Sequence, residues 1–321
     1  MRPLKLVPDN TNIAFLKYRT VAMALSIGLI VGSIALCFIN GFNLGVDFAG
    51  GQSVRVSFQQ PVDAVKLREQ IEALGVGETT IQRFGNDRDV AIRTPVPESS
   101  DPAAADRAAT AIKTTIEKNY PGANVGSVQS VSPKVSQELF RTGGTSLALA
   151  MLAIALYIWF RFEWQFGVGA LFALFHDVAL TLGFFALTQL EFDLNVVAAI
   201  LTIIGYSLND TIVVYDRIRE NMRKYRKMSM EELLNLSINE TLSRTVATSL
   251  SIGLVLTVLL VLGPDVMFGF VAAMLLGIVI GTFSSVYVSA AILLWLRLKP
   301  DSFLPDDVRS GGKAKPATEL P

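Results

Sequence analysis

The chain has 321 residues, of which 51% are hydrophobic and 17% are charged, with 28 basic and 28 acidic residues. This composition is typical of a polytopic membrane protein, and the zero net charge gives no indication of nucleic-acid binding. Cys37 and His176 are the only residues of their kinds, which excludes an intramolecular disulfide, a cysteine-based zinc site and every motif that needs two histidines. We therefore expect neither an enzyme nor a bound cofactor.

The first predicted elements are a basic cytoplasmic arm over residues 1–20 and an apolar run over 21–39. The run is too long for the hydrophobic part of a secretory signal, and no small-residue cleavage site follows it. A lipoprotein signal does not fit either, because Leu36 is too large for the position before a modified cysteine. We expect a retained first transmembrane helix, with Cys37 as a small buried apolar residue.

Residues 40–143 form a long polar segment that alternates between strand and helix patterns. Period-2 alternation predicts a first strand, and turn-flanked apolar runs predict three more. Two stretches with helical spacing lie between them. The strands are expected at 51–58, 80–84, 90–93 and 125–131, the helices at 64–74 and 103–120, and a turn at Gly85-Asn86-Asp87. The order β-α-β-β-α-β predicts a ferredoxin-like domain.

Five more apolar runs are each close to the roughly 20 residues that a bilayer requires. They cover 144–160, 166–189, 195–216, 245–263 and 267–296. The predicted fold is a polytopic α-helical membrane protein with six transmembrane helices and one exported α+β ferredoxin-like domain between helices 1 and 2. Residues 144–298 would form the rest of the bundle, with a basic loop at 217–244, and residues 299–321 a disordered cytoplasmic tail.

Charge in the short loops predicts the orientation. Basic residues crowd the segment after the fourth span, whereas Glu191, Asp193 and Asp265 lie in the opposite loops without any basic residue. The positive-inside rule then places both termini and the 217–244 loop in the cytoplasm and the 40–143 domain on the exported side.

Asp210 lies inside the fourth apolar run, about 15 residues and about 22 Å from its exported end. A carboxylate at this depth costs roughly 2.5–3.5 kcal/mol on insertion scales and marks either an ion or proton path or a buried pairing between helices. The apolar residues 212–215 continue the run, which argues against a position at the membrane surface. Thr202, Tyr206 and Asp210 share one helix face, flanked by Ser207 and Thr211.

Arg244 begins the fifth span, with Thr248 on the same face. It is either an ordinary arginine reaching for the membrane surface or the partner of Asp210, since the two helices share their cytoplasmic ends. An arginine stays protonated, so its role would be to bias the ionisation of Asp210 rather than to carry a proton.

Two further polar features fall inside spans. His176 and Asp177 lie near the middle of the third span, either as a structural pair or as a second station on a proton path. Gly277 and Gly281 form a GxxxG pattern in the sixth span, which predicts close helix packing.

Three segments together resemble the SecF subunits of the bacterial Sec protein-export accessory complex, in the SecD/SecF family of the resistance–nodulation–division superfamily. They are GVDFAGG at 45–51, IGYSLNDTIVVYDRIREN at 204–221 and SRTVATS at 243–249. The resemblance covers roughly residues 13–300, and the intramembrane Asp and Arg of that family fall on Asp210 and Arg244.

The resemblance implies a multi-pass protein of the bacterial cytoplasmic membrane that is driven by the proton gradient. Its implied partners are SecD, which supplies a further acidic residue, the SecYEG channel, YajC and YidC, a translocating polypeptide and membrane lipids, but no nucleic acid. His176, Asp177, Tyr206, Ser207, Asn209 and Thr248 are auxiliary polar candidates. The alternatives are half of a small-molecule or lipid exporter of the same superfamily, or a passive scaffold in which Asp210 and Arg244 only lock helices together.

Overall fold

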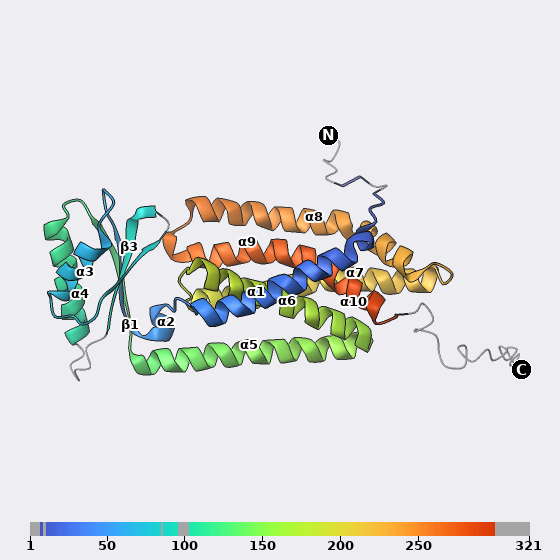
Figure 1. Cartoon of the computed structure of the whole chain (residues 1–321), viewed down its shortest axis with the longest axis horizontal. Coiled ribbons are helices and arrows are strands. Elements are labelled where there is room, and N and C mark those ends of the chain that lie inside the picture. The colour runs from blue at the N-terminus through green and yellow to red at the C-terminus, as the bar shows by residue number, and fades with distance from the viewer. Residues whose placement is uncertain (1–6, 9–10, 85, 96–102, 299–321) are drawn as a thin grey trace, which may run out of the picture.

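The computed structural model describes residues 7–8, 11–84, 86–95 and 103–298. A bundle of long helices carries a small sheet-containing domain at one end (Figure 1). Within these described residues, six helical segments are long and apolar enough to cross a membrane: Phe15–Asn40, Pro133–Arg161, Trp164–Thr188, Leu194–Lys224, Met230–Leu262 and Phe268–Trp295. The predicted fold class is confirmed. The predicted tail at 299–321 and most of the first ten residues of the arm lie outside the described residues.

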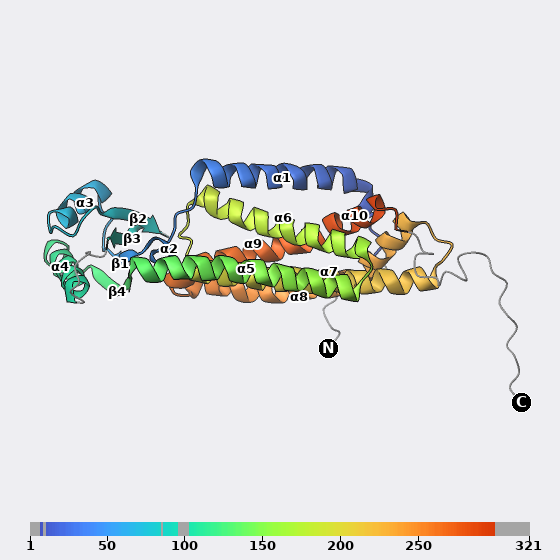
Figure 2. The same cartoon turned by 90° about the horizontal axis from the view of Figure 1, so that it is seen from below.

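The bundle is arranged around α7 and α9. Helix α7 packs along α9, α8 packs against both of them, and α1 lies on the outer side of α6 (Figure 2). The bundle elements are η1 (Phe15–Tyr18), α1 (Arg19–Asn40), α5 (Pro133–Arg161), α6 (Trp164–Thr188), α7 (Leu194–Lys224), α8 (Met230–Leu262), η2 (Asp265–Met267), α9 (Phe268–Phe283), the π-helical segment η3 (Ser284–Val288) and α10 (Ser289–Trp295).

The sheet domain has the predicted ferredoxin-like order. Its four strands pair antiparallel in the order β2-β3-β1-β4, and α3 and α4 cover the face of the sheet that points away from the bundle (Figure 1). Apolar side chains such as Val54, Leu67 and Ile112 fill the space between sheet and helices. The elements are β1 (Gly51–Ser57), α3 (Ala64–Glu72), β2 (Thr80–Phe84), β3 (Asn86–Thr94), α4 (Ala103–Asn119) and β4 (Asn124–Val131).

Two boundaries of this region differ from the sequence prediction by four residues or more. Strand β3 already begins at Asn86, inside the predicted turn, and Gly85 lies outside the described residues. Helix α5 begins at Pro133, well before residue 144. Ser132 caps it by accepting a hydrogen bond from the Val135 amide, and proline is favoured at a first helical position. Hydropathy detects only the apolar part of a helix, so the polar first turns of α5 were missed.

The prediction of a basic loop at 217–244 is wrong, because most of this segment is helical. Helix α7 continues to Lys224 and α8 begins at Met230 behind a capping box of Ser229 and Glu232. Buried apolar side chains join the two extensions into a hairpin: Ile218, Met222, Leu233, Leu234 and Ile238. The charged outer faces of this hairpin hid its helical period from a hydropathy scan.

The predicted close packing at the GxxxG pattern is confirmed. A Cβ atom added at Gly277 would overlap the side chain of Ile203 on α7, and one added at Gly281 would lie 3.2 Å from the Cβ of Ser207. The two glycines therefore allow α9 to approach the helix that carries Asp210.

We expect Gly277→Ala to destabilise the bundle by about 1–3 kcal/mol, because overpacking at a tight contact forces side chains and backbone to move. The measurement is the midpoint of thermal unfolding of the purified chain in detergent. Gly205→Ala on α7 is the matched control, since a Cβ there meets nothing within 4 Å. Equal midpoints for the two variants would contradict the packing argument.

Candidate functional site

Asp210 lies in the middle of the bundle, where three helical segments meet. Its side chain is buried, with 8% of the residue exposed. One carboxylate oxygen accepts a hydrogen bond from the Thr245 hydroxyl of α8 at 2.6 Å, and the other accepts one from the Ser285 hydroxyl of η3 at 2.5 Å. The carboxylate is therefore held by two neutral donors from two neighbouring segments.

The structure does not bring Arg244 to Asp210, which corrects the expected pairing. Arg244 is exposed on α8 and is in no ion pair with any described residue. Successive residues of an α-helix point about 100° apart, and Thr245 occupies the position that faces α7. Arg244 directly precedes Thr245, which bonds to Asp210, so Arg244 does lie close to the depth of Asp210.

A second buried carboxylate, Asp177 on α6, accepts three hydrogen bonds from side chains. The donors are the Ser207 hydroxyl of α7 at 2.5 Å, the Ser284 hydroxyl of η3 at 2.9 Å, and, in one tautomer, Nδ1 of His176 at 2.9 Å. The other ring nitrogen of His176 is buried without a hydrogen-bond partner among the described residues. Asp177 thus ties α6 to α7 and η3.

The π-helical segment brings adjacent serines to the two carboxylates. Ser284 donates to Asp177 and Ser285 donates to Asp210. A widened π turn is uncommon and occurs frequently at functional sites. Sequence reasoning missed Ser284, Ser285 and Thr245 as site residues. The signal that could have revealed the two serines is a run of hydroxyl residues inside an otherwise apolar span: Thr282, Ser284, Ser285 and Ser289.

The auxiliary polar candidates fall into two groups. The Tyr206 hydroxyl bonds with Ser249 of α8 at 2.9 Å, and Ser249 bonds with Thr282 of α9 at 2.8 Å. Asn209 and Thr248 are exposed instead, and the Thr248 hydroxyl donates to carbonyl groups of its own helix. Tyr206 and Ser207 therefore belong to the polar centre of the bundle, whereas Asn209 and Thr248 lie outside it.

The chemistry of this centre suits a group that changes its protonation state. A buried carboxylate is costly unless hydrogen bonds satisfy its oxygens. Hydroxyl groups both donate and accept, so Thr245 and Ser285 can bond to the ionised form of Asp210 and, after rotation, to the protonated form. No fixed cation among the described side chains holds Asp210 in one form.

The N-terminus of α7, the helix that carries Asp210, is joined to the sheet domain. Glu191, in the turn between α6 and α7, pairs with Arg93 of β3 at 2.9 Å and with Arg55 of β1 at 3.4 Å. We call these three residues the Glu191 junction. Asp47 accepts a hydrogen bond from the Leu194 amide at 3.0 Å, at the first residue of α7. Backbone hydrogen bonds between residues 43–45 and Phe192 complete the connection.

The paired glycines at the start of β1 are required by this geometry. Gly50 and Gly51 have φ values of 73° and 109°, in the region that favours glycine. A Cβ at Gly51 would lie 2.7 Å from the carbonyl oxygen of Thr94. The tight path lets the chain pass from α2 (Val46–Ala49) into β1 beside the bundle.

Negative charge gathers at the same junction. Burial raises the pKa of Asp193, which caps α7 by accepting a hydrogen bond from the Val196 amide, and the carboxylates of Glu191 and Asp47 add to this rise. Arg55 and Arg93 supply the opposing charge from the sheet domain. Attraction between the sheet domain and the α6–α7 turn therefore has an electrostatic part.

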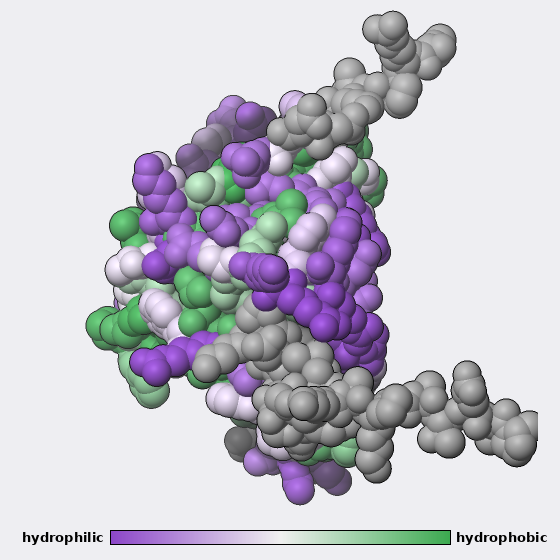
Figure 3. All heavy atoms as spheres, turned by 90° about the vertical axis from the view of Figure 1, so that its right-hand side faces the viewer, coloured by the Kyte–Doolittle hydropathy of each residue, from purple (hydrophilic) through white to green (hydrophobic). Residues whose placement is uncertain are grey.

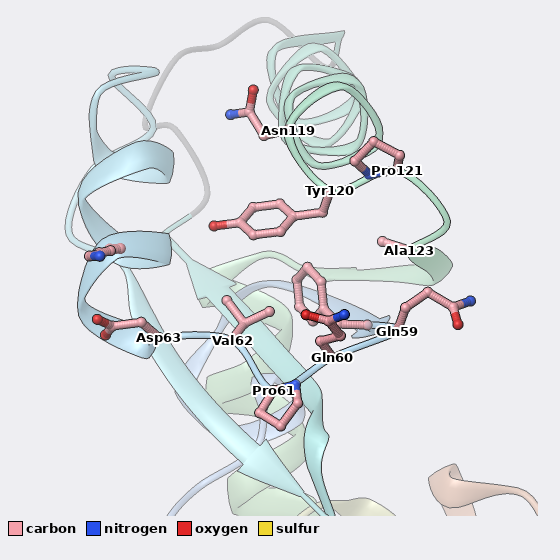
Figure 4. Close-up of a pocket in the computed structure, with 11 residues that line it drawn as sticks. Gln59, Gln60, Pro61, Val62, Asp63, Asn119, Tyr120, Pro121 and Ala123 are labelled. Carbon is pink, nitrogen blue, oxygen red and sulfur yellow. The ribbon is translucent and has the colours of Figure 1, made fainter.

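The sheet domain also carries a pocket of about 390 Å³, between the start of α3 and the end of α4 (Figure 4). Phe58, Val62 and Tyr120 give it an apolar wall, and the amide side chains of Gln59, Gln60 and Asn119 lie around it. Its carboxylate, Asp63, accepts a hydrogen bond from the Val65 amide as the cap of α3. Lys66 also lines the pocket, so a cation and a carboxylate lie beside its apolar wall.

Comparison with known proteins agrees with this architecture. The family model of the C-terminal region of the SecD/SecF protein export membrane proteins matches residues 111–299, and the model of the SecD/SecF GG motif matches 35–62. This chain belongs to the SecD/SecF family. The residues that the GG motif model matches include Gly50 and Gly51, the two glycines at the entry to the sheet domain.

The curated relatives are similar over nearly their whole length. Protein translocase subunit SecF of Pseudomonas aeruginosa is 41% identical over 92% of this chain and 95% of its own. The subunit of the same name from Rickettsia felis is 42% identical over 91% and 94%. That of Cereibacter sphaeroides is 43% identical over 91% and 92%.

Two solved structures of SecDF, a translocon-associated membrane protein, share the fold. The one from Thermus thermophilus matches with a TM-score of 0.82 at 35% identity, and it covers 92% of this chain but only 40% of its own. A SecDF structure in a super-membrane-facing form also covers 92% of this chain and 40% of its own chain, with a TM-score of 0.67. The chain thus spans well under half of a SecDF polypeptide.

Proposed function

We propose that this protein is an accessory subunit of the Sec translocase that uses the proton gradient, together with SecD, to promote late steps of protein translocation. The observation that carries the proposal is the setting of Asp210. This buried carboxylate lies on the helix whose N-terminus contacts the sheet domain, and rotatable hydroxyls of α8 and η3 donate hydrogen bonds to it. Membership of the SecD/SecF family, with relatives named as translocase subunits, supports it. The role is mechanical rather than enzymatic.

Helix α7 is the proposed connection between protonation of Asp210 and movement of the exported domain. Protonation of Asp210 removes its charge and changes which hydroxyls donate to it, which alters the packing of α7 against α8 and η3. One charge that crosses a 100 mV potential supplies about 2.3 kcal/mol, enough to shift a two-state helix arrangement. The shift would reach the exported domain through Asp47 and the Glu191 junction. Arg244 would influence Asp210 in another arrangement of the helices.

The exposed apolar faces of α5 and α8 support the presence of a partner protein within the membrane. Helices α5 and α8 leave many of their apolar side chains exposed, including Leu152, Leu156, Leu254 and Val258. We propose that SecD covers part of this surface and supplies a further acidic residue. SecYEG, YajC and YidC would be further partners. The protein would lie in the bacterial cytoplasmic membrane with both termini in the cytoplasm, as the basic α7–α8 hairpin suggests.

The test is export of a secretory protein into inverted membrane vesicles that contain this chain, SecD and the channel. We expect a proton gradient to increase the yield of completed translocation, and an uncoupler to remove that increase. The same increase in vesicles that lack the chain would contradict the proposal. Co-purification with SecD separates this function from that of a small-molecule exporter, for which the single compact sheet domain leaves little room.

A passive scaffold is the second candidate function, and one observation favours it. The carboxylates of Asp177 and Asp210 both have hydrogen-bond partners within this chain, as expected of groups that only lock helices. A scaffold would support export equally well with and without a proton gradient, so the vesicle measurement separates the two candidates.

A further inference from the structure

A polar pocket lies at the end of the bundle opposite the sheet domain. Its volume is about 560 Å³, and its walls come from the end of α5 and the last turns of α7. The residues that line it are Arg161, Asp216, Arg219, Glu220, Arg223 and Lys224. Figure 3 views this end of the molecule and shows hydrophilic residues spread over it, with hydrophobic residues along the flank.

The pocket has more positive than negative charge available. Its two carboxylates are already paired, Asp216 with Arg161 at 3.3 Å and Glu220 with Arg217 at 2.6 Å. Arg223 and Lys224 are exposed, and neither forms an ion pair with another residue in the described part of the chain. The pocket therefore favours an anion.

Exposed aromatic residues place this pocket at a particular depth. Trp159, Phe160 and Trp164 flank Arg161 in the chain and are 67%, 84% and 53% exposed. Tryptophans on the outside of a membrane protein collect where lipid headgroups meet the hydrocarbon region. Because Arg161 lies between them, the mouth of the pocket lies at headgroup level.

Two of the arginines that line the pocket contact the same aromatic ring. The guanidinium groups of Arg161 and Arg219 lie over the ring of Phe162, 5.0 and 5.3 Å from its centre. Arg161 also pairs with Asp216, and Arg219 pairs with Glu163 at 3.8 Å, so both guanidinium groups are held in place beside the pocket. The remaining cations, Arg223 and Lys224, come from α7, so a bound anion would connect α5 with α7.

We propose that this pocket binds the phosphate headgroup of an anionic phospholipid from the surrounding membrane. Charge at headgroup depth, the neighbouring tryptophans and basic groups from two helices together match this ligand. Basic pockets between transmembrane helices recognise such headgroups in other proteins. The proposal does not depend on proton-driven export, because it requires only that the bundle lies in a bilayer.

The test counts phosphatidylglycerol molecules retained by the detergent-solubilised full chain, measured by native mass spectrometry over a lipid titration. Removal of one basic group near an anionic lipid weakens binding by about fivefold. We therefore expect the double variant Arg223→Gln/Lys224→Gln to bind phosphatidylglycerol at least tenfold more weakly than the unchanged chain, with phosphatidylcholine binding weakly to both.

Arg226→Gln/Lys227→Gln is the matched control. It removes the same two charges from the adjacent turn, at exposed residues that do not line the pocket. Equal loss of phosphatidylglycerol binding in both double variants would overturn the proposal, since it would indicate general attraction to basic residues. Displacement of the lipid by inorganic phosphate at a similar concentration would also overturn it, because the ligand would then be a free anion. Failure of the vesicle export test would leave these outcomes unchanged.

Discussion

Replacement of Asp210 by Asn is expected to abolish the stimulation of export by the proton gradient, while the chain still inserts and assembles with SecD. Asparagine has nearly the same size, and its carbonyl oxygen can still accept a hydrogen bond from Thr245 or Ser285. It cannot bind or release a proton. The measurement is the yield of translocation into inverted vesicles with and without an uncoupler, with assembly followed by co-purification.

Asp216→Asn is the control for this prediction. It makes the same chemical change on the same helix, at an exposed residue whose ion pair with Arg161 is at the surface. Exposed ion pairs contribute about 0–1 kcal/mol, so this variant should retain gradient stimulation. Full stimulation in an assembled Asp210→Asn complex would rule out a proton relay through this residue and favour the scaffold.

Glu191→Gln is expected to loosen the sheet domain from α7 and to reduce gradient-driven export severalfold, without preventing assembly. The Glu191 junction is partly buried, with side-chain exposures of 20% for Glu191 and 14% for Arg93. Loss of one partner at such a site should cost about 1–2 kcal/mol, between the values for exposed and buried pairs. The docked arrangement would then be about 5 to 30 times less favoured.

Hydrogen exchange at two backbone amides measures the loosening directly. The amides of Gly45 and Phe192 donate across the connection between the sheet domain and α7, at 2.9 and 2.8 Å, and should exchange faster in the variant. Arg93→Gln should have a similar effect, and the double variant should lose little more, because the two residues act as one unit. Glu69→Gln, at an exposed position of α3, is the control. Unchanged exchange in Glu191→Gln would contradict a mechanical role for the junction.

Local patterns predicted most of the secondary structure of the chain. The alternation in β1 and the helical spacing of α3 depend only on neighbouring residues, so both elements were placed to within two residues. The charged hairpin at the end of α7 and the start of α8 was missed. Its helices are stabilised by contact with each other, and a scan for apolar runs does not detect such contacts.

The residues of the site also divide into one that local sequence identifies and others that depend on how the helices pack. Asp210 was identified because a carboxylate in an apolar run is costly wherever the helix packs. The hydroxyls of Thr245 and Ser285 could not be assigned to it, because serine and threonine are common in membrane helices and can bond to their own backbone. The choice of Arg244 as partner failed by one residue, which is a rotation of about 100° around the helix.

Residue type and spacing along the chain are enough to predict the number of spans, the ferredoxin-like order of the sheet domain and the position of one costly carboxylate. The groups that surround Asp210 and the contacts between α7 and the sheet domain could be found only in the folded molecule. Those contacts depend on the rotation of each helix about its axis, on the π turn at Ser284–Val288 and on the path at Gly50 and Gly51. Packing between segments distant in the chain sets all three.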